Sequence, residues 1–296
     1  TFKSAARSSM RSCGIWCNYM LEITQATYQH ILQSVVDLGG CDLVLTSPPY
    51  MNARTYGADV SWCFEDYQQL GNAVYTALKP GGHCLMVLDG PVREWRKGFG
   101  TERSFIAWEV MLDWAKRVGF RVPDRLAYGR RGTVGAYAGR FKNEWEPLLW
   151  FQKPGAVGYF DKWPLASETE PYTGQRVKCT RPDGIYERQV TGKAAEMGLA
   201  HRGTLWWYGH IGSSHDIPGE ITQHPARFYS GFAEDAVQCF CPPSGLVCDP
   251  FVGSGTSAAA AVKFGRKFIG GDLFTRVSDG KPWAQIALDR AKEAMS

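Results

Sequence analysis

Apolar positions follow two different spacings along the chain, and the alternation between them predicts helices and strands in turn. Apolar side chains three and four residues apart, as at Tyr28, Ile31 and Val35, indicate a helix with one buried face. Short continuous apolar runs indicate buried strands. We expect helices over 24–37, 64–78, 103–118, 229–240, 256–264 and 283–294, and strands over 14–17, 41–45, 84–88, 148–151, 246–249 and 267–271. Strands that alternate with helices predict an α/β fold with a doubly wound, mostly parallel sheet.

One segment departs from this pattern. From residue 155 to residue 203 the periodicity fades, and Gly, Pro, Thr and isolated charges dominate, which predicts a loop-rich insertion. We therefore expect residues 1–154 and 204–296 to be two halves of one α/β domain, with the insertion 155–203 between them. A chain of 296 residues is long enough for one such domain.

Composition is that of an ordinary globular protein, because 44% of the residues are hydrophobic and 21% are charged. The chain has no apolar run of about 18 residues, so no membrane span is expected, and no secretory signal is visible. Two of the nine cysteines, Cys84 and Cys248, fall in expected buried strands, which favours a reduced, cytoplasmic protein. The cysteine spacings, such as Cys239/Cys241, lack the paired CxxC pattern of a zinc site, so no metal is expected.

The net charge of +4 is unevenly distributed along the chain. Residues 93–142 hold twelve Lys and Arg against five Asp and Glu, whereas residues 1–92 hold five against seven. A concentrated basic stretch in a nearly neutral protein is typical of a surface that contacts phosphates. A merely solvated basic face is the alternative.

A glycine turn links an expected strand to an expected helix at residues 249–256, which read Asp-Pro-Phe-Val-Gly-Ser-Gly-Thr. The glycines allow a tight turn and let a ligand approach the backbone at the helix N-terminus. Asp272 ends the next strand, where a carboxylate would reach ribose hydroxyls. No Gly-Lys-Ser/Thr follows, which disfavours a phosphate-binding loop, and Ala258 stands where an NAD site has its third glycine. The turn favours a nucleoside cofactor without phosphate, with a plain tight turn as the alternative.

A second turn, Ser47-Pro48-Pro49-Tyr50, follows the strand expected over 41–45 and so lies at the carboxyl edge of the sheet, where α/β proteins bind ligands. The two prolines hold the chain extended and lack N–H groups, which leaves the Pro48 carbonyl and the Ser47 hydroxyl as acceptors. Two acceptors beside an aromatic ring suit the exocyclic amino group of a flipped-out base. A rigid loop corner without chemistry is the alternative.

Together, and in this order, the two turns resemble those of DNA amino-methyltransferases of the permuted class, in which the catalytic motif precedes the cofactor motif. The resemblance covers roughly residues 14–154 and 204–292, and implies a Rossmann-like methyltransferase fold that uses S-adenosylmethionine, with 155–203 as the target-recognition region. It implies catalytic roles for Ser47, Pro48, Pro49 and Tyr50. It implies cofactor contacts for Thr46, His224, Pro225, Asp249, Pro250, Phe251, Gly253, Gly255, Thr256 and Asp272.

The same resemblance bears on the base that is modified. Ser before Pro-Pro-Tyr, together with His-Pro-Ala-Arg-Phe at 224–228, is typical of enzymes that methylate N4 of cytosine, whereas Asp in place of Ser47 is the usual adenine N6 version. We therefore expect cytosine N4, with adenine N6 as the alternative. Methylation at cytosine C5 needs a Cys nucleophile, usually after Pro, and the chain contains no Pro-Cys pair.

One departure from the family concerns the cofactor adenine. The family often has Gly-Asp near residue 19, with the acid close to the adenine, but this chain reads Cys17-Asn18-Tyr19-Met20. Asn18 or Tyr19 would then have to replace the acid.

Double-stranded DNA is the expected partner. Candidates for phosphate-backbone contacts are Arg130, Arg131, Arg140 and Lys142, and candidates for base edges or phosphates in the insertion are Arg176, Lys178 and Arg181. Family members often dimerise, but the sequence reveals neither a homodimer interface nor a cognate restriction endonuclease. A protein glutamine amide or an RNA base is an alternative substrate, against which the basic stretch argues. A DNA-binding subunit with a dead site is a further alternative, against which the intact turns argue.

Overall fold

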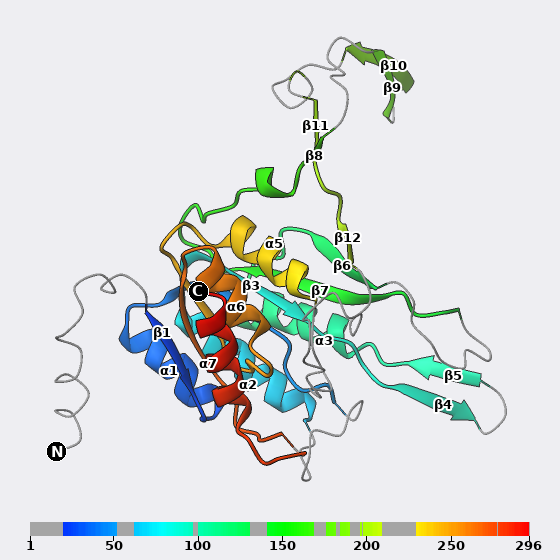
Figure 1. The fold of residues 1–296 in the computed structure, drawn as a ribbon. Coiled ribbons are helices and arrows are strands. Elements are labelled where there is room, and N and C mark those ends of the chain that lie inside the picture. Colours follow the sequence, from blue (N-terminus) through cyan, green and yellow to red (C-terminus); the bar gives the residue numbers. More distant parts are fainter. Residues whose placement is uncertain are drawn as a thin grey trace.

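The computed structural model describes residues 20–51, 62–96, 100–130, 141–168, 176–181, 184–189, 196, 198–208, 229–276 and 278–295. Its centre is an eight-stranded sheet in which only β7 runs antiparallel to its neighbours (Figure 1). In spatial order the strands are β1 (Leu21–Thr24), β14 (Lys267–Gly271), β13 (Leu246–Asp249), β2 (Cys41–Thr46), β3 (Leu78–Val87), β7 (Trp145–Gln152), β6 (Arg125–Arg130) and β12 (Leu205–Tyr208). The prediction of a doubly wound, mostly parallel sheet is confirmed.

Helices cover both faces of this sheet. One layer holds α1 (Tyr28–Asp37), α2 (Phe64–Ala77) and α3 (Ile106–Asp113), and the other holds α5 (Ser230–Phe240), α6 (Thr256–Lys263) and α7 (Trp283–Glu293). Successive residues of β2 alternate between the two layers: Leu43 and Leu45 pack with the second layer, and Val44 packs with the first. Because both faces of β2 are buried, the strand is apolar throughout, as is usual for the middle of a parallel sheet.

Three strands of the sheet lie where the apolar pattern did not predict them. β1, β6 and β12 are four to six residues long, and part of each is exposed to solvent, so none forms a continuous apolar run. The strand predicted over 14–17 lies outside the described residues. The described strand β1 occupies 21–24 and ends at the residue where the helix was expected to begin, and α1 starts only at Tyr28, after the N-cap residue Thr27.

Two predicted boundaries also moved. α2 ends at Ala77 and β3 begins at once with Leu78, because the Pro80-Gly81-Gly82 run lies within an irregular first part of the strand instead of in a loop. The helix predicted over 103–118 begins at Ile106, and its last turn is the π-helix η1 (Trp114–Val118). The chain between β3 and α3 forms a hairpin that the pattern did not predict, β4 (Val92–Arg96) with β5 (Gly100–Arg103).

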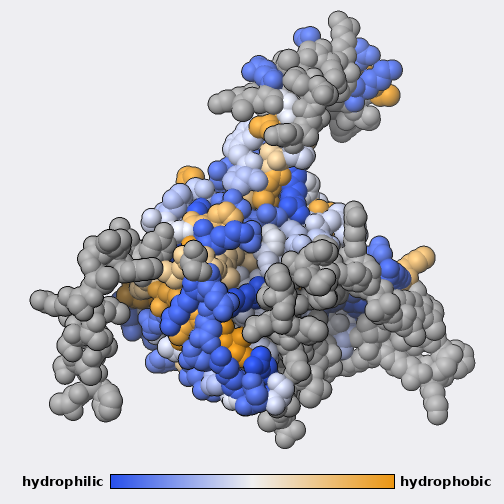
Figure 2. All heavy atoms as spheres, in the orientation of Figure 1, coloured by the Kyte–Doolittle hydropathy of each residue, from blue (hydrophilic) through white to orange (hydrophobic). Residues whose placement is uncertain are grey.

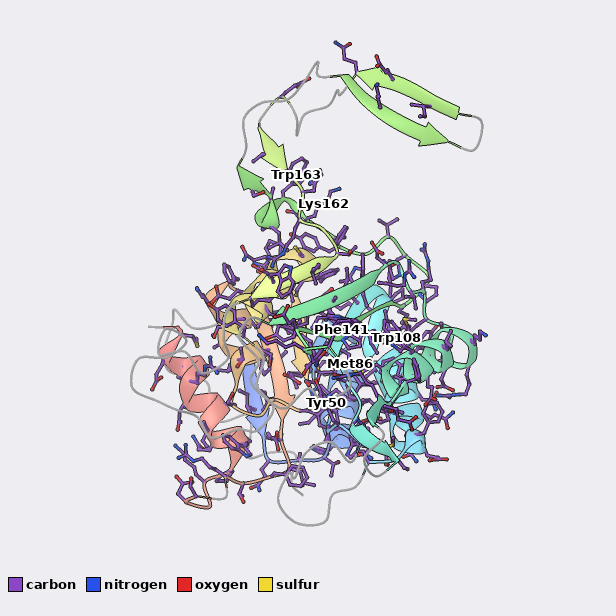
Figure 3. All side chains as sticks on the ribbon, turned by 90° about the vertical axis from the view of Figure 1, so that its right-hand side faces the viewer. Tyr50, Met86, Trp108, Phe141, Lys162 and Trp163 are labelled. Carbon is purple, nitrogen blue, oxygen red and sulfur yellow. The ribbon has the colours of Figure 1, made fainter. Side chains whose placement is uncertain are left out.

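The described parts of the region 155–203 include an arm that projects from the body of the protein (Figure 1). It contains the short helix η2 (Trp163–Leu165), the pair β8 (Ser167–Glu168) with β11 (Leu199–Ala200), and the outer hairpin β9 (Arg176–Arg181) with β10 (Gly184–Gln189). At the root of the arm, the Asp161 N–H donates to the Cys239 carbonyl of α5 at 2.9 Å. Figure 3 shows Lys162 and Trp163 at this root, and Figure 2 shows that the coloured atoms of the outer hairpin are mostly hydrophilic.

The cysteines of the described residues are free thiols, and all except Cys63 are buried. Burial of Cys84 and Cys248 agrees with their predicted places in strands. Within the described part of the chain, no helix has the length and apolar character needed to cross a membrane.

Candidate active site

The two turns singled out in the sequence lie side by side. The turn predicted to be catalytic (Ser47–Tyr50, called the catalytic turn) follows β2. The turn predicted to bind the cofactor (Pro250–Gly255, called the cofactor turn) follows β13. These strands are parallel neighbours, so both turns leave the carboxyl edge of the sheet. A hydrogen bond joins the two strand ends: the Thr46 hydroxyl donates to Asp249 Oδ1 at 2.7 Å. Residues about 200 positions apart in sequence thus form one site.

The catalytic turn is held from below by α2. The Tyr67 hydroxyl donates to the Pro49 carbonyl at 2.7 Å and accepts from the Met51 N–H at 3.0 Å. Tyr67 is itself buried, and its own carbonyl accepts from the Trp114 indole at 2.9 Å. The turn is therefore fixed on a packed helix layer.

Tyr50 is held from the other side by β7. Its hydroxyl donates to Glu146 Oε2 at 3.0 Å, and both residues are 5% exposed. Because β7 runs antiparallel, its first residues lie at the carboxyl edge of its neighbours, which brings Glu146 to the turn. Figure 3 shows Tyr50 inside the body of the molecule. Its contact with a base stays a prediction.

The other two residues of the catalytic turn have different surroundings. Ser47 is partly exposed and Pro48 is buried. Among the described residues, neither the Ser47 hydroxyl nor the Pro48 carbonyl has a hydrogen-bond partner. Both acceptors that the sequence singled out therefore lack a partner within the described part of the chain, and we call them the open acceptors.

The Asp249 carboxylate faces into the protein. Oδ1 accepts from Thr46 and from the Phe251 N–H at 3.1 Å, and Oδ2 accepts from the Ser257 hydroxyl at 2.5 Å. Asp249 is 1% exposed, and this burial raises its pKa to about 6, an effect that the bonds from Ser257 and Thr46 oppose. Thr46 and Asp249 were both predicted to contact the cofactor, whereas the described side chains contact each other.

The cofactor turn is shaped by Gly255 and Arg290. Gly255 has a φ of +82°, and a Cβ there would lie 2.6 Å from the Cα of Ala287, so only glycine fits. Arg290 of α7 donates to the Ser254 carbonyl at 3.2 Å and to the Thr256 hydroxyl at 2.9 Å. The turn is thus clamped on α7. Pro250 and Gly253 are buried, and Phe251 is partly exposed.

Asp272 directly follows β14, next to this turn. Its carboxylate accepts from the Gly253 N–H at 3.1 Å and from the Phe274 N–H at 2.9 Å. It is 8% exposed, and burial raises its pKa. A carboxylate held beside a glycine backbone at adjacent strand ends is the set of groups that binds the ribose of a nucleoside cofactor. The described residues fit S-adenosylmethionine in this respect.

The strand β1 ends beside Asp272. The Asp272 N–H donates to the Thr24 carbonyl at 3.3 Å. The next residue, Gln25, is exposed, and its side-chain amide donates to the Leu273 carbonyl at 3.2 Å. For the cofactor adenine the sequence pointed to Asn18 or Tyr19, which lie outside the described residues.

An aromatic group lines the same edge of the sheet. The ring centroids of Tyr28, Trp62 and Phe251 lie 5.3–5.8 Å from one another, and Trp62 is also 5.1 Å from Tyr67. These rings come from the starts of α1 and α2 and from the cofactor turn. They connect the two turns through an apolar wall.

The residues predicted to bind DNA are only partly described. Arg131 and Arg140 lie outside the described residues, as do the side chains of Arg130, Arg176 and Arg181. His224 and Pro225, which were predicted to contact the cofactor, also lie outside them. Lys142 is exposed and 3.3 Å from Glu144, and Lys178 is exposed on β9. Two arginines of the basic stretch form ion pairs within the protein: Arg103 pairs with Asp89, and Arg117 pairs with Asp113. The charge available for phosphates is therefore smaller than the sequence count.

The strand directions place the predicted DNA contacts at opposite edges. β6 and β12 end with Arg130 and Tyr208 at the carboxyl edge, the edge that also carries the two turns, but β3 and β7 lie between β6 and β2. The arm joins the sheet at the other edge, after the end of antiparallel β7 and before the start of β12. Its role in target recognition stays a prediction.

Four residues of the site were not recognised from the sequence as functional. Tyr67 was expected only as an apolar helix position, and Ser257 and Arg290 carried no signal. Glu146 is the one acid of β7, whose other residues are mostly apolar, and that contrast could have identified it. The contacts of all four depend on which elements become neighbours in space.

Comparisons with known proteins agree with this geometry. The profile of a family of N6 and N4 methyltransferases, described as DNA methylase, matches residues 41–276. The orphan methyltransferase M.BamHII of Bacillus amyloliquefaciens is 26% identical over 269 residues, which cover 86% of this chain and 91% of that protein. The structure is similar to that of PvuII DNA methyltransferase (cytosine-N4-specific), with a TM-score of 0.60, 18% identity and 94% of each chain covered. It is also similar to the M1.HpyAVI–SAM complex, with a TM-score of 0.56, 18% identity, and 92% of this chain and 100% of that chain covered.

Proposed function

Because the chain belongs to the DNA methylase family of N6 and N4 methyltransferases, we propose that it is a site-specific enzyme that methylates the N4 amino group of a flipped-out cytosine in double-stranded DNA. Its cofactor is S-adenosylmethionine, as in this family. The observation that carries the proposal is that two polar groups of the catalytic turn are bound by the protein core and two are not. The Pro49 carbonyl and the Tyr50 hydroxyl are held by the core, while the Ser47 hydroxyl and the Pro48 carbonyl have no partner among the described residues.

The two open acceptors suit an amino group. When bound, S-adenosylmethionine supplies a methyl group that its sulfonium makes electrophilic. Ser47 and Pro48 accept hydrogen bonds from the two amino hydrogens and so turn the nitrogen lone pair out of conjugation with the ring. The carbon–nitrogen bond forms as the methyl–sulfur bond breaks, and one amino hydrogen leaves as a proton to water. Such a reaction depends mainly on alignment of the reacting atoms.

Cytosine is favoured over adenine by one residue of the catalytic turn. Ser47 occupies the position at which N6-adenine enzymes usually have Asp. Adenine N6 is the second candidate.

We place the DNA along the carboxyl edge of the sheet. Both turns, the end of β6 and the hairpin β4–β5 leave the sheet there. A two-stranded ribbon has the dimensions to enter a DNA major groove. The basic residues near Arg130 would then contact phosphates. One copy of the chain is enough for this placement of the DNA, which needs neither a homodimer nor a cognate endonuclease.

Methyl transfer to different polymers tests this proposal. The protein is incubated with S-adenosylmethionine labelled in the methyl group and with duplex DNA, RNA or protein, and Ser47→Ala serves as the control. We expect label in duplex DNA, strongly reduced by Ser47→Ala, with binding of the cofactor unchanged. Label in RNA or protein but not in DNA would contradict the proposed substrate, and full activity of Ser47→Ala would contradict the role of the turn.

A further inference from the structure

We propose that Thr46, Asp249 and Ser257 form a positioning network that fixes the catalytic turn relative to the cofactor turn, and that the Asp249 carboxylate acts on these turns and not on the cofactor. This inference depends on the proposed function only in its activity assay, which measures methyl transfer. Asp249 and Thr46 are thereby given a role different from the cofactor contact that the sequence motif implies.

Three separate elements meet at this one carboxylate. Thr46 is the last residue of β2, Phe251 belongs to the cofactor turn, and Ser257 lies in the first turn of α6. Their donors lie 2.5–3.1 Å from the Asp249 oxygens. A shift of the β2 end relative to the β13 end would break the bond from Thr46.

The carboxylate is closed to a ligand. Thr46, Asp249 and Ser257 are each 0–1% exposed. The carboxylate already accepts from three donors, and the burial of these residues leaves no exposed path by which a cofactor hydroxyl could reach it. Asp272, in contrast, accepts only two backbone N–H groups and lies beside the cofactor turn. Of the two acids in the motif, Asp272 therefore has the geometry of the ribose ligand.

The network adjoins the catalytic turn in the chain. Ser47, whose hydroxyl is one of the two open acceptors, follows Thr46 in the chain. Hydrogen bonds to an ionised carboxylate are shorter and stronger than neutral ones, so Asp249 ties the turns together more firmly than an amide would. A misplacement of about 1 Å in an aligned transfer costs roughly 100-fold in rate. The network thus affects the rate of methyl transfer by fixing the position of the catalytic turn.

A pair of substitutions at Thr46 separates the hydroxyl from the shape of the side chain. Thr46→Val keeps the shape and removes the donor, and Thr46→Ser keeps the donor. Thr76→Val, on the exposed side of α2, is the matched control. The measurements are the dissociation constant of S-adenosylmethionine, by calorimetry, and the rate constant of a single turnover at saturating cofactor and DNA, counted as total methyl groups on any base.

We expect Thr46→Val to lower the rate constant at least about tenfold with a cofactor affinity within about threefold of wild type, and Thr46→Ser to restore most of the rate. A loss of cofactor affinity equal to the loss of rate would overturn the proposal in favour of direct cofactor binding. Equal losses in Thr46→Val and Thr46→Ser, or no loss in Thr46→Val, would also overturn it.

A second measurement does not depend on activity. In a double-mutant cycle between Thr46→Val and Ser257→Ala, the effects on the unfolding free energy should be non-additive, because both donors bind one carboxylate. Additive effects would contradict the network. A wild type that methylates no DNA would contradict the proposed function, while this cycle would still decide about the network.

Discussion

Replacing Tyr67 by Phe removes a hydroxyl that makes two hydrogen bonds to the catalytic turn, at 2.7 Å to the Pro49 carbonyl and at 3.0 Å from the Met51 N–H. Pro49 and Tyr67 are buried, so water does not readily replace the lost partner. At about 1 kcal/mol for each bond, the unfolding free energy should fall by about 2 kcal/mol. If the same energy holds the turn in its active position, the rate of methyl transfer should fall by up to roughly 30-fold.

Urea unfolding and single-turnover methylation of duplex DNA measure these two quantities. Tyr75→Phe is the matched control, because Tyr75 lies two turns further along α2 and packs its ring on Phe120. The control should change neither quantity appreciably. A Tyr67→Phe protein that loses the expected stability but transfers methyl groups at the wild-type rate would refute the idea that this hydroxyl positions the turn. Unchanged stability would refute the energetic reasoning itself.

Three further predictions follow from the site and the arm. Asp272→Ala should weaken S-adenosylmethionine binding roughly 10- to 100-fold, as expected for a lost charged hydrogen bond. Calorimetry measures the affinity, with Asp279→Ala, which removes an exposed acid paired with Arg276, as the control. Equal affinities of Asp272→Ala and wild type would contradict the role of Asp272. Arg202 pairs with Asp235 at 2.6 Å and lies over the rings of Trp206 and Tyr208. Arg202→Ala should therefore lower the unfolding free energy, measured in urea, by about 2 kcal/mol. Arg202→Lys should retain only part of this stability. Wild-type stability of Arg202→Lys would show that the planar guanidinium is not needed. Because burial raises the pKa of Asp249 to about 6, above the usual value of about 3.9, the native state binds this proton more tightly than the unfolded chain. The contribution of Asp249 to stability should therefore increase as the pH falls from about 6 to about 4, by at most about 3 kcal/mol. Unfolding of wild type and Asp249→Asn at several pH values tests the sign, and a wild type that loses stability relative to the variant over this range would contradict it.

Both turns could be found in the sequence because their signals are local. Two consecutive prolines restrict the backbone of Ser47–Tyr50, and the glycine at 255 is required by a positive φ and by the closeness of Ala287. The central strands were predicted because burial on both faces makes them apolar throughout. These features depend on a few adjacent residues and hardly on the rest of the fold.

The missed features depend on contacts between distant segments. Tyr67 meets Pro49 across 18 residues and Glu146 meets Tyr50 across 96, through the packing of α2 and the antiparallel direction of β7. The inward direction of the Asp249 carboxylate depends on β2 and β13 being neighbours. β1 was missed because its four residues, all at least partly exposed, carry too little apolar periodicity.

Identification of the methylated nucleoside tests the central claim most directly. Unmethylated duplex DNA is incubated with the wild-type protein and S-adenosylmethionine, digested to nucleosides and analysed by mass spectrometry, with Ser47→Ala as the parallel sample. We predict N4-methylcytosine from the wild type and a strongly reduced amount from Ser47→Ala. N6-methyladenine without N4-methylcytosine would contradict the assignment of the base.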